Sequence, residues 1–433
     1  MKKIINKTLS AHINVDYRSY ATYILESRGI PNFYDALTNV QRFILQNAPI
    51  NYVKSLKIVG DCISSGYHHG NSSLENALNT LARPYLCSQQ IIEGDGFFGN
   101  PVKRDAASPR YTSARLSKKS HEILSKYKNL NFTNEGDGWE YLKMEVPLGL
   151  LSDTTGIAIG YSCQFLPRKY EHIIEYLEGK RKSLKPFLIN YEGNIIKNKE
   201  GGTSSWIIEP IISKNSQKNE IYINDISPTI KYEAYVKKIN DIIEEYNCNV
   251  INVTKDKIAL TLKFPKNIKP KELDIIYDKI LKFSTAKYSE NIVFIKDKNV
   301  LEYDTIEDYL DDFKNYREFL FKDQIEYDLN KLEFELEYLK ARKLYLEYML
   351  TPGTKTNAEI ESFLQQFEKN IYHRLDALKL RLLNKQFLKE TESLIKEIIS
   401  LIKSKKIELN NQSKTCNFIK NIIIKAKTST IKK

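Results

Sequence analysis

Two stretches in the second half of this 433-residue chain carry apolar side chains at alternating steps of three and four residues. They are residues 305–350 and 386–412, and Thr351-Pro352-Gly353 ends the first. Such a seam is typical of long helices that pack along one another. We therefore expect a long antiparallel coiled-coil arm with a small helical segment, 351–385, at its tip; a plain helical bundle is the open alternative. The seam consists of Ile325, Leu329, Leu332, Leu336, Leu339, Leu346 and Leu350, interrupted by Lys343, and of Leu388, Thr391, Ile395, Ile398 and Ile402.

The first 150 residues have a mostly helical pattern that Gly, Pro and Asn interrupt. Ser72-Ser73-Leu74-Glu75 has the form of a capping box, and apolar residues then repeat on one helical face. This pattern predicts a helix that begins at the box and ends before Pro84. A helical domain whose helix starts beside a basic loop is consistent with a winged-helix DNA-binding domain, and other small helical domains fit the pattern as well.

Residues 151–304 have a different texture, in which short β-rich runs alternate with helical stretches. We expect a separate α+β domain here, and a C-terminal helix or tail over 413–433. The chain is thus predicted to be a multidomain α+β protein. The runs that carry this prediction are Ser205–Ile211, Glu220–Ile223, Asn249–Val253 and Ala259–Phe264 for strands, and Tyr232–Tyr246 for a helix.

The charge of the chain favours an anionic partner such as nucleic acid. Lys and Arg number 66 against 54 Asp and Glu, so the formal net charge is +12. The abundance of Lys, Asn and Ile also fits an AT-rich genome. The 5 cysteines are scattered without CxxC spacing, which argues against a zinc site and a disulfide framework. Without a signal peptide or an apolar span, the sequence predicts a soluble cytoplasmic protein.

A short loop, Ala106-Ala107-Ser108-Pro109-Arg110-Tyr111-Thr112, places a tyrosine next to an arginine. A phenol can attack a phosphodiester and hold the broken strand as a phosphotyrosine if cations stabilise the charge that develops on phosphorus. An ordinary phenol has a pKa of about 10 and is a poor nucleophile at neutral pH, so positive groups must surround it. Residues 103–128 are rich in Lys and Arg, which fits a phosphate site and also a solvated basic surface.

Several motifs, in the same order along the chain, resemble those of the breakage-reunion subunit of type IIA DNA topoisomerases, the DNA gyrase A and topoisomerase IV A family. Residues 28–42 resemble the RAIPD-x-x-DGLKPVQRR segment, and 54–61 and 66–74 resemble KSARIVGD and YHHGE-x-SL. Residues 94–100 resemble the DGQGNFG element, and 106–112 resemble the AASPRYT-type catalytic loop. Gly156-Ile157-Ala158-Ile159-Gly160 is similar to the family's GIAVG turn. The YHHG and SPRY forms resemble those of the phage and eukaryotic branch. The chain length favours the phage enzymes of that branch, in which the breakage-reunion subunit is a separate chain.

The resemblance implies an architecture and a mechanism. Residues 1–150 would form a winged-helix DNA-gate domain with an N-terminal arm, 151–304 a tower domain, and 305–350 with 386–412 the coiled-coil arm. Residues 351–385 would be a helical C-gate that dimerises two copies into a homodimer. Tyr111 would then take the 5′ phosphate of the cleaved strand and Arg110 would stabilise the transition state. The remaining catalytic residues implied by the resemblance are Arg28 and His69.

Further residues are implied as DNA contacts. Ile157 matches an isoleucine that wedges between base pairs and bends the duplex. His68 neighbours His69; the two could also be a metal pair, but no third ligand has suitable spacing. Relative to DGLKPVQRR, this chain lacks the glycine, a lysine, the proline and one arginine, so one phosphate contact is missing. The backbone contacts that the resemblance implies are Arg42, Lys54, Lys57, Ser72, Arg115 and Lys118.

The implied function is that of the DNA-cleaving and religating subunit of an ATP-dependent type II topoisomerase, an isomerase that passes one duplex through a transient break in another. Because the chain lacks a Glu with a nearby Asp-x-Asp and lacks a phosphate loop, Mg²⁺ and ATP are expected on a partner subunit. The expected partners are double-stranded DNA, a second copy of the chain and that ATPase and metal-binding polypeptide. The alternative is a non-catalytic architectural DNA-binding protein. A tyrosine recombinase would need an Arg-His-x-x-Arg set that is missing here.

Overall fold

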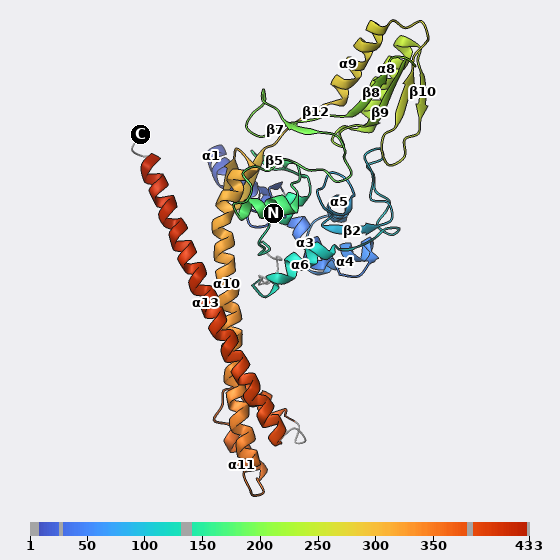
Figure 1. The fold of residues 1–433 in the computed structure, drawn as a ribbon. Helices are drawn as coiled ribbons and strands as arrows, with labels where there is room; N and C mark the ends of the chain where they lie inside the picture. Colours follow the sequence, from blue (N-terminus) through green and yellow to red (C-terminus); the bar gives the residue numbers. More distant parts are fainter. Residues whose placement is uncertain (1–7, 26–28, 131–140, 379–383, 431–433) are drawn as a thin grey trace, which may run out of the picture. The chain divides into compact units, whose positions relative to one another are not determined.

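The computed structural model describes residues 8–25, 29–130, 141–378 and 384–430. It separates into two units, Met1–Tyr316 and Arg317–Lys433, and the long helix α10 (Ile306–Leu350) begins in the first and continues into the second (Figure 1). No helix among the described residues has the length and apolar character that crossing a membrane requires.

The part of the first unit before residue 131 combines helices with a small sheet. Its elements are α1 (Leu9–Ala11), a π-helix (His12–Tyr17), α2 (Arg18–Ile24), α3 (Asn39–Asn47), β1 (Val53–Lys54), α4 (Ser55–Ser64), α5 (Asn71–Ala82), β2 (Ile92–Asp95), β3 (Ser113–Leu116), α6 (Lys118–Lys126) and a 3-10 helix (Lys128–Leu130). The three strands form an antiparallel sheet of order β1-β3-β2. The helical pattern alone did not indicate these strands, because each has only two to four residues.

The predicted capping box at the start of α5 is wrong. The helix begins at Asn71 with Gly70 as its cap residue and without a side-chain cap, so Ser72 and Ser73 already lie within the first turn. The predicted end before Pro84 is confirmed, since α5 stops at Ala82 and the residue before a proline disfavours helical geometry.

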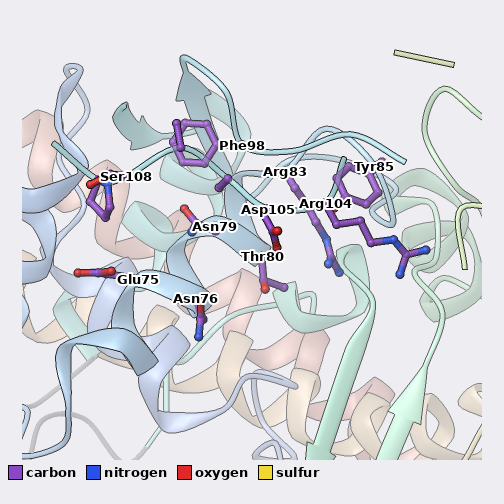
Figure 2. Close-up of a pocket in the computed structure, with 13 residues that line it drawn as sticks. Glu75, Asn76, Asn79, Thr80, Arg83, Tyr85, Phe98, Arg104, Asp105 and Ser108 are labelled. Atoms are coloured by element: carbon purple, nitrogen blue, oxygen red, sulfur yellow. The ribbon is translucent and has the colours of Figure 1, made fainter. Parts of the chain in front are cut away.

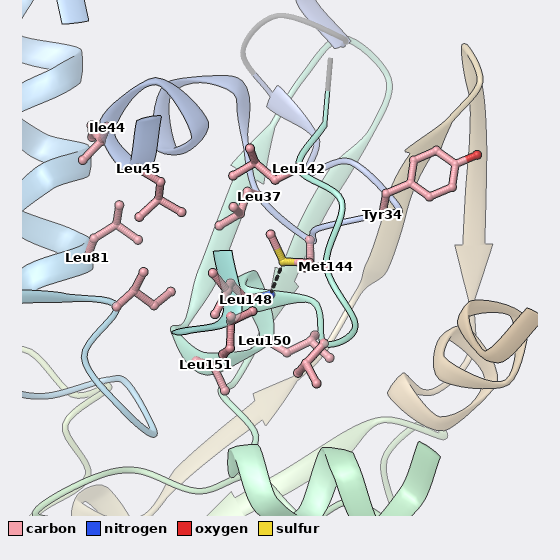
Figure 3. Close-up of a cluster of buried hydrophobic side chains, with 14 of the residues drawn as sticks. Tyr34, Leu37, Ile44, Leu45, Leu81, Leu142, Met144, Leu148, Leu150 and Leu151 are labelled. Atoms are coloured by element: carbon pink, nitrogen blue, oxygen red, sulfur yellow. Dashed lines mark hydrogen bonds between the residues drawn. The ribbon is translucent and has the colours of Figure 1, made fainter. Parts of the chain in front are cut away.

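The main hydrophobic core joins residues that are far apart in sequence. Leu37 from the loop before α3, Ile44 of α3 and Leu81 of α5 pack together with Leu148 and Leu151 from a 3-10 helix (Leu148–Leu151), as Figure 3 shows. The same cluster also includes the β4–β5 hairpin (Thr154–Ile157 and Ser162–Phe165), α7 (Tyr170–Leu177), the β13–β14 hairpin (Ile292–Lys296 and Asn299–Tyr303) and the start of α10. The predicted boundary at 150/151 therefore does not separate two cores.

Two further sheets occupy residues 195–289. β12 (Ala286–Ser289), β7 (Ser205–Ile208) and β6 (Ile195–Lys197) form one, and the other has the order β10-β11-β9-β8. The strands of the second are β8 (Ile211–Asn215), β9 (Glu220–Asp225), β10 (Asn249–Asn252) and β11 (Leu260–Lys263), and it shares a core with α8 (Tyr232–Tyr246) and α9 (Pro270–Ser284). We call residues 211–284 the α8/α9 body.

The predicted β-rich run Ser205–Ile211 is divided between two strands. The structure ends β7 at Ile208 and starts β8 at Ile211, and the two strands belong to different sheets. Pro210 lies between them and has no N–H to donate to a sheet. The predicted helix Tyr232–Tyr246 is confirmed with the same bounds.

The second unit contains most of α10, then α11 (Asn357–Leu364), α12 (Lys369–Asp376) and α13 (Lys385–Thr430). Ile325 and Leu329 of α10 pack against Ile402 of α13, and Lys343 binds Glu392 at 2.8 Å. Early residues of α10 therefore meet late residues of α13, so the two helices are antiparallel. Lys343, which interrupts the apolar seam, is used for an ion pair with the other helix.

Candidate active site

The Tyr111 loop is held between the start of α4 and the small sheet. The Ser55 amide donates to the Thr112 carbonyl at 3.1 Å, and the Leu56 amide donates to the Pro109 carbonyl at 3.3 Å. The Thr112 hydroxyl also donates to the Ser55 hydroxyl at 2.8 Å, and both residues are buried. Tyr111 itself is 72% exposed, and Arg110 is exposed beside it. The fold thus fixes the backbone of the loop and directs the phenol to solvent, where a duplex can reach it.

The glycine-rich run 94–99 allows the close packing behind this loop. A Cβ at Gly94 would lie 2.4 Å from the buried ring of Phe98, and one at Gly99 would lie 2.5 Å from the Arg104 carbonyl oxygen. Gly96 and Gly99 also have φ of +106° and +86°, which side chains rarely adopt. These glycines are required by backbone packing.

Two of the predicted backbone contacts lie close to the loop. Lys54 is paired in the β1–β3 ladder with Ser113, which is two residues after Tyr111 in the chain. The Lys54 side chain is exposed. Lys57 is exposed in the first turn of α4 and binds Asp61 at 2.6 Å. Together with Arg110 they give the loop a basic edge. An exposed ion pair of this kind contributes little to stability, so Lys57 can exchange Asp61 for a phosphate.

His69 is held by aromatic rings at the start of α5. The ring of Tyr67 lies edge-on at 5.3 Å from it, and Tyr23 of α2 lies at 6.4 Å. The Tyr67 hydroxyl donates to Ser73 at 3.1 Å, which ties the buried tyrosine to the helix. His68 and Ser72 are exposed nearby. Sequence reasoning gave no role to Tyr23 or Tyr67, although Tyr67 is the first residue of the YHHG motif.

The Ile157 turn meets the N-terminal motif. Ile157 ends β4 and is 79% exposed, so its side chain is free to contact a partner. A Cβ at Gly29 would lie 2.5 Å from the Ala158 Cβ, and one at Gly156 would lie 1.9 Å from the Gly29 carbonyl oxygen. Two motifs far apart in sequence therefore pack through glycines. Arg28, the predicted catalytic arginine, lies outside the described residues.

Arg42 does not have the exposed position that a DNA contact needs. Its side chain is buried, and Nε donates to Asp35 at 2.8 Å while Nη2 donates to the Leu37 carbonyl at 3.0 Å. Asp35 also accepts from the amides of Leu37 and Leu142. Burial raises the pKa of Asp35 and the Arg42 charge opposes that shift. The predicted DNA role of Arg42 is corrected to a structural one.

Arg115 and Lys118 lie further along the chain from Tyr111 than Arg110 does. Arg115 binds Glu93 at 2.7 Å, which raises the pKa of its guanidinium, and it lies over the ring of Tyr52 at 4.4 Å. Lys118 is exposed at the start of α6. Tyr111 precedes β3 in the chain, whereas Lys118 follows it. Any contact of these two side chains with DNA would be at a distance from the cleaved bond.

A pocket of about 490 Å³ lies behind the catalytic loop (Figure 2). One side is formed by residues 104–109 and the other by Glu75, Asn76, Asn79 and Thr80 of α5. The pocket thus lies between α5 and the tyrosine loop. Among the residues that the structure describes, no group of three or more His, Cys, Asp and Glu side chains is arranged to hold a metal ion.

The fold and the sequence of the chain are similar to those of known proteins. The fold matches the Plasmodium falciparum topoisomerase II DNA-binding, cleavage and re-ligation domain with a TM-score of 0.78 and 19% identity, covering 96% of this chain and 65% of the other. The DNA topoisomerase medium subunit of Enterobacteria phage T4 is 26% identical over 84% of this chain and 86% of its own length. The DNA gyrase A protein of Buchnera aphidicola subsp. Baizongia pistaciae is 24% identical over 80% of this chain, which covers 45% of that protein.

The fold is that of the DNA-cleavage part of a type II topoisomerase. The family model for the A subunit of DNA gyrase/topoisomerase IV matches residues 28–423. The chain belongs to this family, as its motifs predicted. It spans most of the phage relative and about half of the gyrase relative.

Proposed function

We propose that this chain cleaves and religates DNA within an ATP-dependent type II topoisomerase, with Tyr111 as nucleophile. The observation that carries the proposal is the position of Tyr111: an exposed phenol on a backbone fixed by α4 and the β1-β3-β2 sheet, with Arg110, Lys54 and Lys57 beside it. These cations would offset the negative charge that develops on phosphorus during the attack.

The reaction is a transesterification. The Tyr111 oxygen bonds to phosphorus as its proton leaves, the bond from phosphorus to the 3′ oxygen breaks, and the 3′ oxygen takes up a proton. The protein keeps the 5′ phosphate, and attack by the 3′ hydroxyl reverses each change. One bond to phosphorus replaces another, so resealing needs no separate energy source.

The packing around this site also supports a winged-helix assignment, because α3, α4 and α5 share a hydrophobic core with the three-stranded antiparallel sheet. In the proposed assembly two copies of the chain each cut one strand, and Ile157 bends the duplex by insertion. The antiparallel pair α10 and α13, with α11 and α12 between them in sequence, would be the coiled-coil arm and C-gate. A partner subunit would supply the Mg²⁺ site and the ATPase.

Detergent trapping with an end-labelled duplex tests the nucleophile. The chain is mixed with its partner subunit, Mg²⁺ and duplex, and the reaction is stopped with detergent. A label at the 3′ end of either strand should remain on this chain, whereas a 5′ label should be released, because the protein holds the 5′ phosphate.

Tyr111→Phe should abolish the adduct, and Tyr52→Phe, a change of another exposed tyrosine that leads into β1, should leave it intact. DNA binding with no adduct in the unmodified chain would instead favour the architectural alternative.

A further inference from the structure

The catalytic loop has little support from α5. The pocket of about 490 Å³ separates residues 104–109 from the helix, so the loop is not packed against it there (Figure 2). Its position depends on the bonds at its two ends and on the amide of Ala107, which donates to the Phe97 carbonyl at 2.9 Å. The end at Pro109 and Thr112 is fixed by α4, as described above.

The other end of the loop is bound to the α8/α9 body. Nη2 of Arg104 donates to the Pro228 carbonyl at 2.5 Å and to the Ile230 carbonyl at 2.8 Å. These acceptors belong to the turn between β9 and α8, where the Ile230 amide donates to the Ser227 carbonyl at 3.0 Å. Ile230 packs against the core of the body. The guanidinium therefore binds a turn that is itself fixed.

Neighbouring residues strengthen this connection. The Asn100 side chain accepts from the amides of Val102 and Lys103 at 3.0 and 2.7 Å and donates to Asp256 of the body at 3.2 Å. Val102 packs against the core that contains α8 and α9. The chain from Asn100 to Arg104 thus follows the body, although Tyr111 is only seven positions beyond Arg104.

We propose that Arg104 is a positioning residue for Tyr111, and that the α8/α9 body sets the position of the catalytic loop through it. The inference rests on the proposed function, since it assumes that Tyr111 attacks DNA. Reactions of bound groups depend steeply on their alignment, and a displacement of about 1 Å can reduce a rate about 100-fold. Loss of the Arg104 bonds should therefore reduce the rate of strand cleavage with little effect on DNA affinity.

The test compares Arg104→Gln with Lys218→Gln in the complex with the partner subunit. Lys218 is exposed on the β8–β9 turn of the same body, so its change removes the same charge without touching the loop. At saturating DNA the single-turnover rate of adduct formation should fall about 10- to 100-fold in Arg104→Gln only. The DNA concentration for half-saturation should change less than about twofold and its salt dependence should not change. Arg104→Lys, which can still donate to the carbonyls, should recover part of the rate.

Asp256→Ala is a second test variant in case the melting temperature of Arg104→Gln shows that this variant does not fold. It removes the exposed bond to Asn100 and should slow cleavage in the same direction, by a smaller factor. Because both changes weaken one connection, their effects should be less than additive in the double variant.

Three outcomes would overturn the inference or its basis. An unchanged cleavage rate in both Arg104→Gln and Asp256→Ala would exclude a positioning role. Weaker binding by Arg104→Gln, with a salt slope reduced by about 1, would show that Arg104 contacts a phosphate instead. If the unmodified chain forms no adduct at all, the proposed function fails and not merely this inference.

Discussion

At the scale of single residues, Ala36 shows how a departure from a family motif is accommodated. The related motif has glycine at this position, and the structure gives Ala36 a φ of +56°, in the left-handed region. Its carbonyl oxygen would lie 1.8 Å from a Cβ at Gly149, so the surrounding backbone leaves the turn no room to relax. Left-handed geometry costs an alanine about 1–2 kcal/mol.

We predict that Ala36→Gly changes the free energy of unfolding by less than about 1 kcal/mol. Relief of the strained backbone should stabilise the variant. The loss of a buried methyl group, about 0.8 kcal/mol, and the greater freedom of glycine in the unfolded chain should destabilise it. Ala114→Gly is the control, because Ala114 is equally buried in β3 and its φ is not positive. In denaturant titrations Ala114→Gly should lower the free energy of unfolding by at least about 1 kcal/mol more than Ala36→Gly does. Equal losses would contradict a strained backbone at Ala36.

Arg42 carries the second prediction at this scale. Arg42→Met should lower the free energy of unfolding by about 3–5 kcal/mol, because it leaves the buried Asp35 without its charge partner. The loss should shrink at acidic pH, where Asp35 is protonated, and the double variant with Asp35→Asn should recover part of it. DNA binding by the folded fraction should keep its salt slope. If Arg42→Met has normal stability and a reduced salt slope of DNA binding, the result would instead support the phosphate contact that the sequence suggested for Arg42.

At the scale of elements, the sequence predicted long helices well and short strands poorly. The heptad seam of α10 extends over many turns, and Tyr232–Tyr246 has a clear helical period, so local pattern was sufficient. β1, β2 and β3 are each two to four residues long and are stabilised by pairing with distant segments. The division at Pro210 had a local signal, the missing N–H, which the β-rich composition on either side obscured.

Asp225 at the end of β9 predicts a pH effect on the α8/α9 body. Burial raises the pKa of its carboxyl to about 6 from an ordinary value of 3.8. The ionised group is therefore destabilising at pH 7, and this cost disappears as pH falls through about 6 toward 4. Asp225→Asn should be more stable than the unmodified chain at pH 7 and equally stable near pH 4. If the gain in stability of Asp225→Asn does not depend on pH, the raised pKa of Asp225 is contradicted.

At the scale of the whole molecule, the ordered motifs predicted the family, which is confirmed, and the candidate site residues, whose roles stay predictions. They named candidate residues, but not how the chain holds them. That Arg42 turns inward to Asp35, or that Arg104 reaches residues 228–230, depends on tertiary contacts without a local pattern. The aromatic contacts of His69 with Tyr67 and Tyr23 are of the same kind.

The complete reaction is expected to need a second polypeptide. The purified chain should bind DNA but should not relax supercoils, because we propose that a partner subunit supplies the Mg²⁺ site and the ATPase. Addition of the ATPase and metal-binding subunit with Mg²⁺ and ATP should produce relaxation, as measured on agarose gels. Relaxation by the chain alone would disprove the division of labour.

The most direct test of the account is the chemical identity of the adduct. Trapped complexes are digested with nuclease and protease, and the peptides that carry a nucleotide are sequenced by mass spectrometry. The account predicts one modified residue, Tyr111, joined through a 5′ phosphate. A nucleotide on any other residue, or a 3′ phosphate linkage, would contradict it.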